Sequence, residues 1–245
     1  MKFLFLIFPF FVFSQSVFDI KTEPIYIDAK SVDEIREFTL DSIYPYIYTN
    51  IPSLKTLDVV QRKKKFIQLI LPAILFEKSK IRKALKSIND DSVEELYLYC
   101  NCKSRDKLIE CLSNQPNSII LAQAAIESGW GTSRFFIEGL NLFGVHSYNK
   151  TDLRMQAIGT TISSPVYVKK YNDISSSISD YLRTLAKSHA YTDFRMHRKG
   201  YDSVLNLIKY LTHYSERREQ YVKDLELIIK HNNLFIYDSL DVDWE

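Results

Sequence analysis

A single carboxylate, Glu127, stands at the end of an apolar run of mostly small residues and directly before two glycines. The run 119–126 is typical of a tightly packed helix, and Gly129 and Gly131 end it because glycine adopts left-handed backbone angles without strain. Trp130 lies between the glycines and brings a large apolar face with one N–H donor. Apolar surroundings disfavour the charged form of a carboxylic acid and raise its pKa. The pattern therefore predicts that Glu127 is a general acid.

The elements that must hold Glu127 in place are predicted to be helices. Apolar residues recur at spacings of three, four and seven over 57–88, which predicts a long helix that Pro72 kinks or splits. The segments 31–34 and 92–95 are capping-box patterns, each a Ser followed three residues later by a Glu. The first is expected to open a helix that fades near residue 44. Asn117 or Ser118 is expected to cap the helix of Glu127.

The remaining segments complete a mostly helical pattern with one exception. Residues 145–171 lack a helical period and contain the alternating stretch 166–168, which predicts a small β-hairpin or irregular lobe. An extended segment is expected at 25–27, and the acidic tail 235–245 is expected to pack loosely. Further helices are expected over 105–112, 132–137, 173–185, 189–198, 201–211 and 216–231. The predicted fold class is α+β, mostly α, with a small β lobe next to the helix of Glu127.

Composition excludes one large class of function. The chain has 245 residues, of which 46% are hydrophobic, so it can fill a sizeable core. Its 32 basic and 30 acidic residues leave a formal charge of only +2, which gives no electrostatic support for nucleic-acid binding. No nucleic-acid partner is therefore expected.

The N-terminus is typical of an exported protein. Lys2 precedes the apolar run 3–13, and small residues follow it, which predicts a signal peptide over residues 1–14. The run is too short to cross a bilayer comfortably, since that takes about 20 apolar residues. An uncleaved anchor is the alternative. After cleavage no stable membrane span is expected, and the protein is placed in the periplasm or cell envelope, or is secreted.

The cysteines and histidines do not predict a metal site. Cys100, Cys102 and Cys111 are close in sequence, so an exported chain can form one disulfide between Cys111 and either of the other two. The five histidines are scattered and show no ligand spacing, and no fourth ligand lies near the cysteines. No metal and no cofactor are expected.

Several motifs together resemble the bacterial glucosaminidase family that cleaves peptidoglycan, and within it the Bax-type branch. The resemblance is centred on 124–135, which contains Glu127, and on the Asn-Leu-Phe-Gly stretch 141–144. It extends to Leu-Pro-Ala-Ile-Leu at 71–75, to 189–195 and to Tyr-Ser-Glu-Arg at 214–217, followed by Tyr-Val at 221–222 and His-Asn at 231–232. The Glu-Ser-Gly core alone is less specific, because lysozyme-like transglycosylases also use a Glu-Ser pair.

The resemblance covers about residues 60–234 and carries clear implications. It implies a lysozyme-like fold, a groove for a polymer of N-acetylglucosamine and N-acetylmuramic acid, and hydrolysis at the N-acetylglucosaminyl β-1,4 bond with Glu127 as the acid. Tyr214 matches a tyrosine near the family's active site. The residues expected to contact substrate or shape its cleft are Ser128, Trp130, Asn141, Phe143 and Tyr191, with packing the favoured role of Trp130.

The second catalytic group is not specified by the sequence. Cleavage of a glycoside requires an acid and a group that stabilises or captures the oxocarbenium-like centre. Many family members are credited with a second Glu in the β lobe, but residues 140–171 contain only Asp152 as a carboxylate. Asp152 is therefore one candidate base. The other candidate is the substrate's own N-acetyl group, oriented by Tyr214. A feeble enzyme is the third reading.

The sequence thus predicts an endo-β-N-acetylglucosaminidase that acts as a monomer on the peptidoglycan glycan strand. The expected organisation is a signal peptide (1–14), an N-terminal extension that packs on the domain (15–59), the catalytic domain (60–234) and a C-terminal tail (235–245). A lytic transglycosylase on the same fold and a non-catalytic wall-binding protein are the alternatives.

Overall fold

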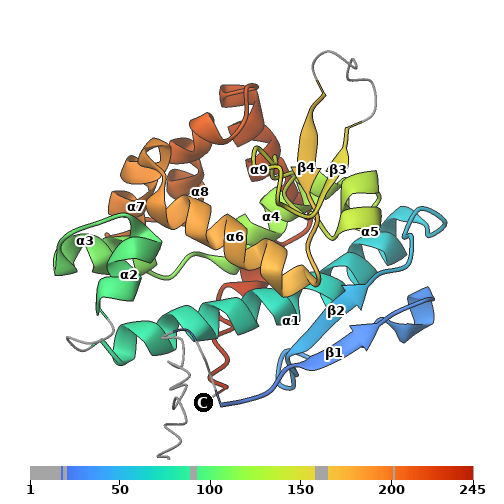
Figure 1. The fold of residues 1–245 in the computed structure, drawn as a ribbon. Coiled ribbons are helices and arrows are strands. Elements are labelled where there is room, and N and C mark those ends of the chain that lie inside the picture. Colours follow the sequence, from blue (N-terminus) through green and yellow to red (C-terminus); the bar gives the residue numbers. More distant parts are fainter. Residues whose placement is uncertain (1–17, 19–20, 89–92, 158–164, 201, 245) are drawn as a thin grey trace, which may run out of the picture.

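The computed structural model describes residues 18, 21–88, 93–157, 165–200 and 202–244 of the chain, and the predicted signal peptide lies outside them. The described residues form a mostly helical fold with two small sheets (Figure 1). This confirms the predicted mostly helical α+β class. The helices are α1 (Val59–Lys86), α2 (Val93–Cys100), α3 (Arg105–Leu112), α4 (Asn117–Ser128), α5 (Arg134–Gly139), α6 (Ile174–Lys187), α7 (Thr192–Lys199), α8 (Val204–Leu207) and α9 (Glu219–His231).

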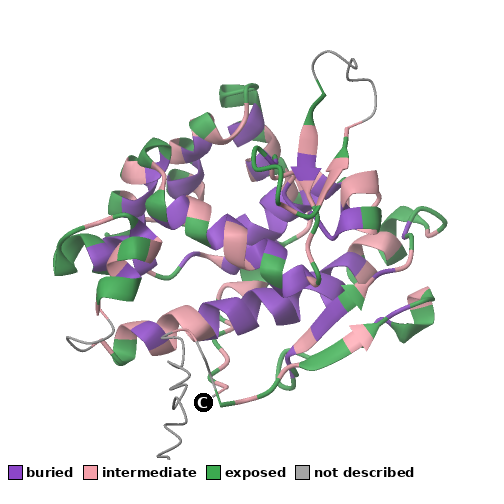
Figure 2. Ribbon diagram, viewed as in Figure 1, coloured by how far each residue is buried: buried purple, intermediate pink, exposed green. Residues whose placement is uncertain are grey.

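Helix α1 runs through the centre of the molecule as one continuous helix. Asp58 caps it, because its carboxylate accepts hydrogen bonds from the N–H groups of Val60 (2.9 Å) and Gln61 (3.0 Å). Residues 66–79 are buried on every side of the helix, as Figure 2 shows along its length. Pro72 lies within this buried stretch without ending the helix, so the expectation of a split there is wrong. Packing on all faces outweighs the hydrogen bond that proline cannot donate.

The N-terminal segment packs on α1 through a parallel two-stranded sheet. Strands β1 (Ile25–Asp28) and β2 (Tyr46–Asn50) pair with Ile25 opposite Tyr46. The helix expected from residue 31 is wrong beyond its first turn: only a 3₁₀ turn, η1 (Val32–Glu34), forms. The Ser31 hydroxyl donates to the Glu34 carboxylate at 3.1 Å, but the Ser31 side chain caps no N–H of the turn, and the chain then turns inward and buries Ile35.

The β lobe is an antiparallel hairpin next to α5, which confirms its prediction. Strands β3 (Arg154–Gln156) and β4 (Tyr167–Lys169) pair with Met155 opposite Val168. Gly139, the last residue of α5, lies against this lobe: a Cβ there would come within 3.0 Å of the Met155 sulfur. The tight contact holds the hairpin beside the chain that follows α4 (Figure 1).

The C-terminal half surrounds α4. Helix α6 is capped by Asp173, as the sequence predicts, and packs along α1. Helix α9 packs on α4 and on the 3₁₀ helix η3 (Ile208–Tyr214), while η2 (His189–Tyr191) leads into α7. The tail continues through η4 (Leu234–Tyr237) against the beginning of α4.

The tail does not pack loosely, so that expectation is wrong. The guanidinium of Arg82 on α1 pairs with Asp241, and the ammonium of Lys86 lies 2.8 Å from Asp243. The ring of Trp244 lies 6.1 Å from that of Phe76. The tail therefore connects α1 with α4. Among the described residues no helix has the length and apolar character needed to cross a bilayer.

Candidate active site

Helix α4 places Glu127 at the border between the core and the surface. Nearly all of its residues are buried, and Glu127 near its end is half-buried. Ala122, Ala124 and Ala125 are fully buried or nearly so, and their small side chains let α1 and α9 come close to the helix. An apolar helix with one ionisable side chain at its open end is thus the frame of the site.

The turn after Glu127 is held by a run of left-handed backbone angles, with φ of 58° at Gly129, 56° at Trp130 and 79° at Gly131. A Cβ on Gly131 would lie 3.0 Å from both Leu54 and Phe66, so the position requires glycine for space as well as for backbone angle. The sequence prediction of a glycine-ended helix is confirmed.

Ser128 closes this turn from inside the protein. Its hydroxyl donates to the carbonyl of Ala124 at 2.6 Å and accepts from the N–H of Gly131 at 3.0 Å. The N–H of Trp130 donates to the carbonyl of Ala125 at 2.9 Å, which satisfies a terminal helix carbonyl. Ser128 is fully buried, so the structure gives it a role in shaping the turn. A direct substrate contact by Ser128 stays a prediction.

Trp130 packs against α1. Its ring meets Phe66 edge to face at 5.6 Å, and the ammonium of Lys63 lies 5.1 Å from the ring centre. The ring is half-buried. These contacts support the packing role that the sequence favoured.

The beginning of α4 is capped from the far end of the chain. Asp238 accepts hydrogen bonds from the N–H and the hydroxyl of Ser118, each at 2.7 Å. Asn117 uses its amide to donate to the carbonyls of Tyr237 (2.7 Å) and Leu240 (3.1 Å). The expectation that Asn117 or Ser118 caps the helix is therefore wrong, because the capping carboxylate comes from the tail.

The environment of Glu127 suits an acid. Burial raises the pKa of Glu127, while a hydrogen bond from the Tyr221 hydroxyl and the charge of Arg217 oppose the rise. Arg217 is exposed and also pairs with Asp224 on α9. The carboxyl group consequently remains protonated to higher pH than a solvated glutamate and still has a defined hydrogen-bond partner.

Tyrosine side chains gather beside Glu127. Tyr214 stacks on Tyr221 with ring centres 5.5 Å apart, and Tyr191 and Tyr181 lie 6.1 Å and 6.3 Å from Tyr214. All four tyrosines have raised pKa values because of burial and the nearby charge of Glu127. The structure thus brings Tyr214 and Tyr191, two predicted site residues, together with Glu127.

Tyr221 belongs to a stretch that resembles the family, but the sequence assigned it no role in the site. It lies on α9 and makes the hydrogen bond to Glu127. Gln123, one helical turn before Glu127, donates to the Tyr221 hydroxyl at 3.2 Å. A glutamine inside an otherwise apolar helix was the available signal, because a buried amide needs polar partners.

Two other predicted residues shape the loop after α5. Asn141 is buried; its amide donates to the carbonyls of Val145 and Lys169, both at 2.9 Å. Phe143 stacks on Tyr181 with centres 4.0 Å apart. Asn141 thus holds this loop to the β lobe and Phe143 packs it on the tyrosine cluster. Their contact with substrate stays a prediction.

Asp152 lies in the loop of the β lobe. The Ser147 hydroxyl donates to its carboxylate at 2.9 Å, and its charge contributes to the raised pKa of Tyr171. Asp152 is not among the groups that act on the pKa of Glu127. Its role as a base stays a prediction.

The described residues contain no group of three or more His, Cys, Asp or Glu side chains suited to hold a metal ion. The three cysteines are free thiols. A hydrogen bond from the Cys100 thiol lowers the pKa of Cys111, and the same contact raises the pKa of Cys100. The structure therefore places Cys100 and Cys111 together without a disulfide.

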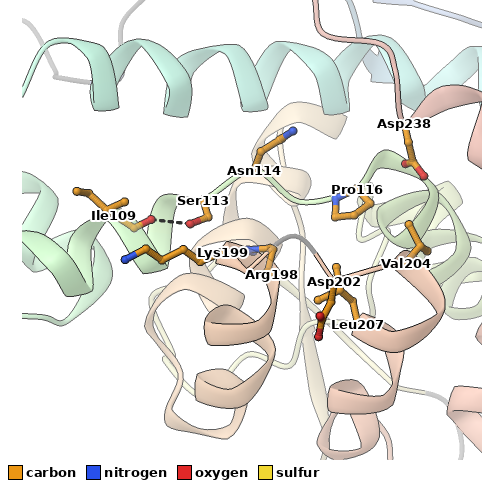
Figure 3. Close-up of a pocket in the computed structure, with 10 residues that line it drawn as sticks. All are labelled: Ile109, Ser113, Asn114, Pro116, Arg198, Lys199, Asp202, Val204, Leu207 and Asp238. Atoms are coloured by element: carbon orange, nitrogen blue, oxygen red, sulfur yellow. Dashed lines mark hydrogen bonds between the residues drawn. The ribbon is translucent and has the colours of Figure 1, made fainter.

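The pocket in Figure 3 is separate from Glu127. Its volume is about 530 Å³, and none of the predicted site residues lines it. It lies between α3, α7 and α8, with Arg198, Asp202 and Asp238 among its walls. Its two carboxylates are engaged elsewhere, with His197 and with Ser118.

One family model matches a part of the chain that contains α4. The family model for Glucosaminidase, described as mannosyl-glycoprotein endo-beta-N-acetylglucosaminidase, matches residues 108–234. The protein named bax from Escherichia coli (strain K12) is 35% identical over 94 residues, which are 37% of this chain and 31% of that protein. The chain thus spans about a third of the length of this relative.

A solved structure shows a weaker likeness. The catalytic domain of the autolysin Auto from Listeria monocytogenes is 21% identical, with a TM-score of 0.44, over 64% of this chain and 94% of that one. The family model, by contrast, covers just over half of the 245 residues and includes Glu127, Tyr214 and Tyr221. The chain belongs to the glucosaminidase family.

Proposed function

We propose that the protein hydrolyses the β-1,4 N-acetylglucosaminyl bonds of the peptidoglycan glycan strand, with Glu127 as general acid. The observation that carries this proposal is a half-buried glutamate with a raised pKa, at the end of helix α4 in a glucosaminidase-family chain. A protonated carboxyl group at this point is able to give its proton to the leaving glycosidic oxygen.

The tyrosine cluster supports substrate assistance as the second half of the reaction. In that mechanism the substrate's N-acetyl oxygen attacks the anomeric carbon while Glu127 protonates the leaving group, and water then opens the intermediate. Tyr214 is half-buried, stacks on the tyrosine that binds Glu127, and is proposed to orient the N-acetyl group. Asp152 as a base for water is the competing route.

A lytic transglycosylase is the second candidate function. It is favoured by one observation: among the described groups that act on the pKa of Glu127, none is a second carboxylate. In that reaction the sugar's own hydroxyl replaces water and leaves an anhydro end. Both candidates need a protein outside the cytoplasm, so we propose export through the signal peptide of residues 1–14, action in the cell envelope, and a monomer.

The test compares the full chain with Glu127→Gln on purified cell walls, followed by mass spectrometry of the released muropeptides. Glu226→Gln is the matched control, because Glu226 is a partly exposed glutamate on α9 that pairs with Lys230. We expect the wild type and Glu226→Gln to release reducing N-acetylglucosamine ends, and Glu127→Gln to be slower by about 10²–10⁴-fold.

Each other outcome has a defined meaning. Equal cleavage by Glu127→Gln would refute the role of Glu127. Anhydro-muramic ends would identify a transglycosylase, and wall binding without cleavage by any of the three proteins would identify a non-catalytic binder.

A further inference from the structure

A row of buried polar side chains joins Glu127 to a buried arginine on α7. Each member is at most 7% exposed apart from the half-buried Glu127 at its end. The row draws on four helices, α7, α6, α4 and α9, and on the loop before α4 (Figure 1). We name it the relay; its members in order are Arg198, Gln115, Tyr181, Gln123, Tyr221 and Glu127.

The first links of the relay have a fixed direction. Arg198 Nη1 lies 3.2 Å from Gln115 Oε1, and a guanidinium only donates, so this contact sets which end of the amide faces Arg198. The amide nitrogen of Gln115 must then face Tyr181, to whose hydroxyl it donates at 2.6 Å. The Tyr181 hydroxyl accepts this bond and is therefore able to donate its own hydrogen to another acceptor.

The hydrogen bonds in the second half of the relay run in the same direction, from donor to acceptor toward Glu127. The Tyr181 hydroxyl donates to Gln123 Oε1 at 2.6 Å. Gln123 consequently turns its amide nitrogen toward Tyr221 and donates to that hydroxyl at 3.2 Å. With its oxygen occupied in this way, Tyr221 donates its proton to the carboxylate of Glu127.

We propose that the relay fixes the Tyr221 hydroxyl as a donor to Glu127, starting from the permanent charge of Arg198. Gln115, Tyr181 and Gln123 are thus positioning residues for the acid, although none of them contacts Glu127 directly. This inference rests on the proposed function for its catalytic meaning, but the direction of the links from Arg198 to Tyr221 rests on their geometry.

The starting point of the relay is itself held firmly. Arg198 Nη2 donates to the carbonyls of Cys111 (2.9 Å) and Glu110 (3.3 Å), and the guanidinium lies 5.4 Å from the ring centre of Phe194. Arg198 also forms part of the wall of the pocket in Figure 3, which none of the predicted site residues lines. The guanidinium is therefore a fixed donor.

Loss of the Tyr181 hydroxyl removes the hydrogen bond that fixes the orientation of the Gln123 amide. Without the proton of Tyr181, the Gln123 amide is free to rotate and present its oxygen to Tyr221. The Tyr221 hydroxyl then has a neutral acceptor in competition with Glu127, and the carboxylate loses its hydrogen bond. Loss of a hydrogen bond to the charged form raises the pKa of an acid.

Several titratable groups face Glu127. They come from every element packed around it and are Arg217 before α9, Tyr221 on α9, Tyr214 on η3, Tyr191 on η2 and Tyr181 on α6. Among these, Arg217 is the one cation, and the relay variants below leave it untouched.

The experiment follows the carboxyl carbon of Glu127 by ¹³C NMR titration in the full chain, assigned with Glu127→Gln. The variants are Tyr181→Phe, which keeps the ring that stacks on Phe143, and Gln115→Met. Tyr48→Phe is the matched control, because Tyr48 is an equally buried tyrosine whose hydroxyl accepts from the N–H of Arg36 at 2.8 Å, outside the relay.

We expect the pKa of Glu127 to rise by about half a unit or more in Tyr181→Phe and, in the same direction, in Gln115→Met. The pKa is expected to stay unchanged in Tyr48→Phe. The high-pH limb of kcat/KM on cell walls should move upward with it, since the acid then remains protonated to higher pH.

An unchanged pKa in the folded relay variants, or an equal shift in Tyr48→Phe, would overturn the proposal. If Tyr181→Phe does not fold, Gln115→Met decides. A shifted pKa of Glu127 in a protein that cleaves no glycan would support the relay and refute the proposed function. Glycan cleavage without a shift in this pKa would support the proposed function and refute the relay.

Discussion

Replacement of Asp238 by alanine is expected to destabilise the whole protein, although Asp238 lies in the C-terminal tail. The carboxylate accepts from both the N–H and the hydroxyl of Ser118, which is fully buried at the first turn of α4. Loss of an N-terminal cap costs about 1 kcal/mol, and loss of a negative charge there costs a further 0.3–1 kcal/mol, roughly. The unsatisfied buried N–H and hydroxyl add about 1–3 kcal/mol.

The total for Asp238→Ala is about 2–5 kcal/mol, which corresponds to a fall in melting temperature of about 4–20 °C for a chain of this size. Asp238→Asn is expected to lose about 1 kcal/mol or less, because the amide still offers an oxygen to the N–H of Ser118 and a donor to its hydroxyl. Urea denaturation followed by circular dichroism measures both.

Asp243→Ala is the matched control, since Asp243 lies in the same tail and pairs with Lys86 at 2.8 Å where both side chains are half-exposed. An exposed pair of this kind contributes about 0–1 kcal/mol. If Asp238→Ala and Asp243→Ala cost the same small amount, Asp238 does not cap α4 and the reasoning fails.

Three further substitutions test the site and the core. Gly131→Ala is expected to cost about 1–3 kcal/mol, because the new methyl group meets Leu54 and Phe66 at a positive φ; an unchanged urea midpoint would contradict the tight turn. Glu127→Gln is expected to raise the melting temperature at pH 7 and to lose this advantage toward pH 4, since a raised folded pKa makes the wild type less stable as pH rises through it. A difference independent of pH between these values would refute that sign. Burial lowers the pKa of Lys78 to about 7, so the wild type should gain stability from pH 7 toward 10, while Lys78→Met should flatten this dependence in urea titrations. Parallel curves for the two proteins would show that Lys78 is not the group responsible.

Local signals in the sequence predicted the elements that depend on neighbouring residues. The bounds of α3, the cap of α6 at Asp173 and the glycine turn after Glu127 all follow from side chains within a few positions. The 3₁₀ turn at Ser31 shows the limit of such signals. The Ser31 side chain bonds to the Glu34 carboxylate and caps no N–H, while burial of Ile35 and the hydrogen bond from Arg36 N–H to the Tyr48 hydroxyl decide where the helix stops.

Long-range partners account for the parts that the sequence did not predict. Asp238 caps a helix that begins 120 residues earlier, and Tyr221 reaches Glu127 from a different helix. Neither pairing leaves a trace in spacing or periodicity. Pro72 is a similar case, because its tolerance inside α1 depends on packing from all sides and not on the local pattern.

The position of Asp238 also constrains the order in which the site is assembled. A chain that emerges from its N-terminus exposes α4 long before the residues that complete its first turn. Until residues 237–240 arrive, the helix that carries Glu127 begins with unsatisfied N–H groups and its partner helix α9 is absent. Glu127 is therefore fully positioned only when α9 and the C-terminal tail have packed on α4. A wall-cleaving activity of the proposed kind is thus delayed until synthesis and folding of the chain are nearly complete.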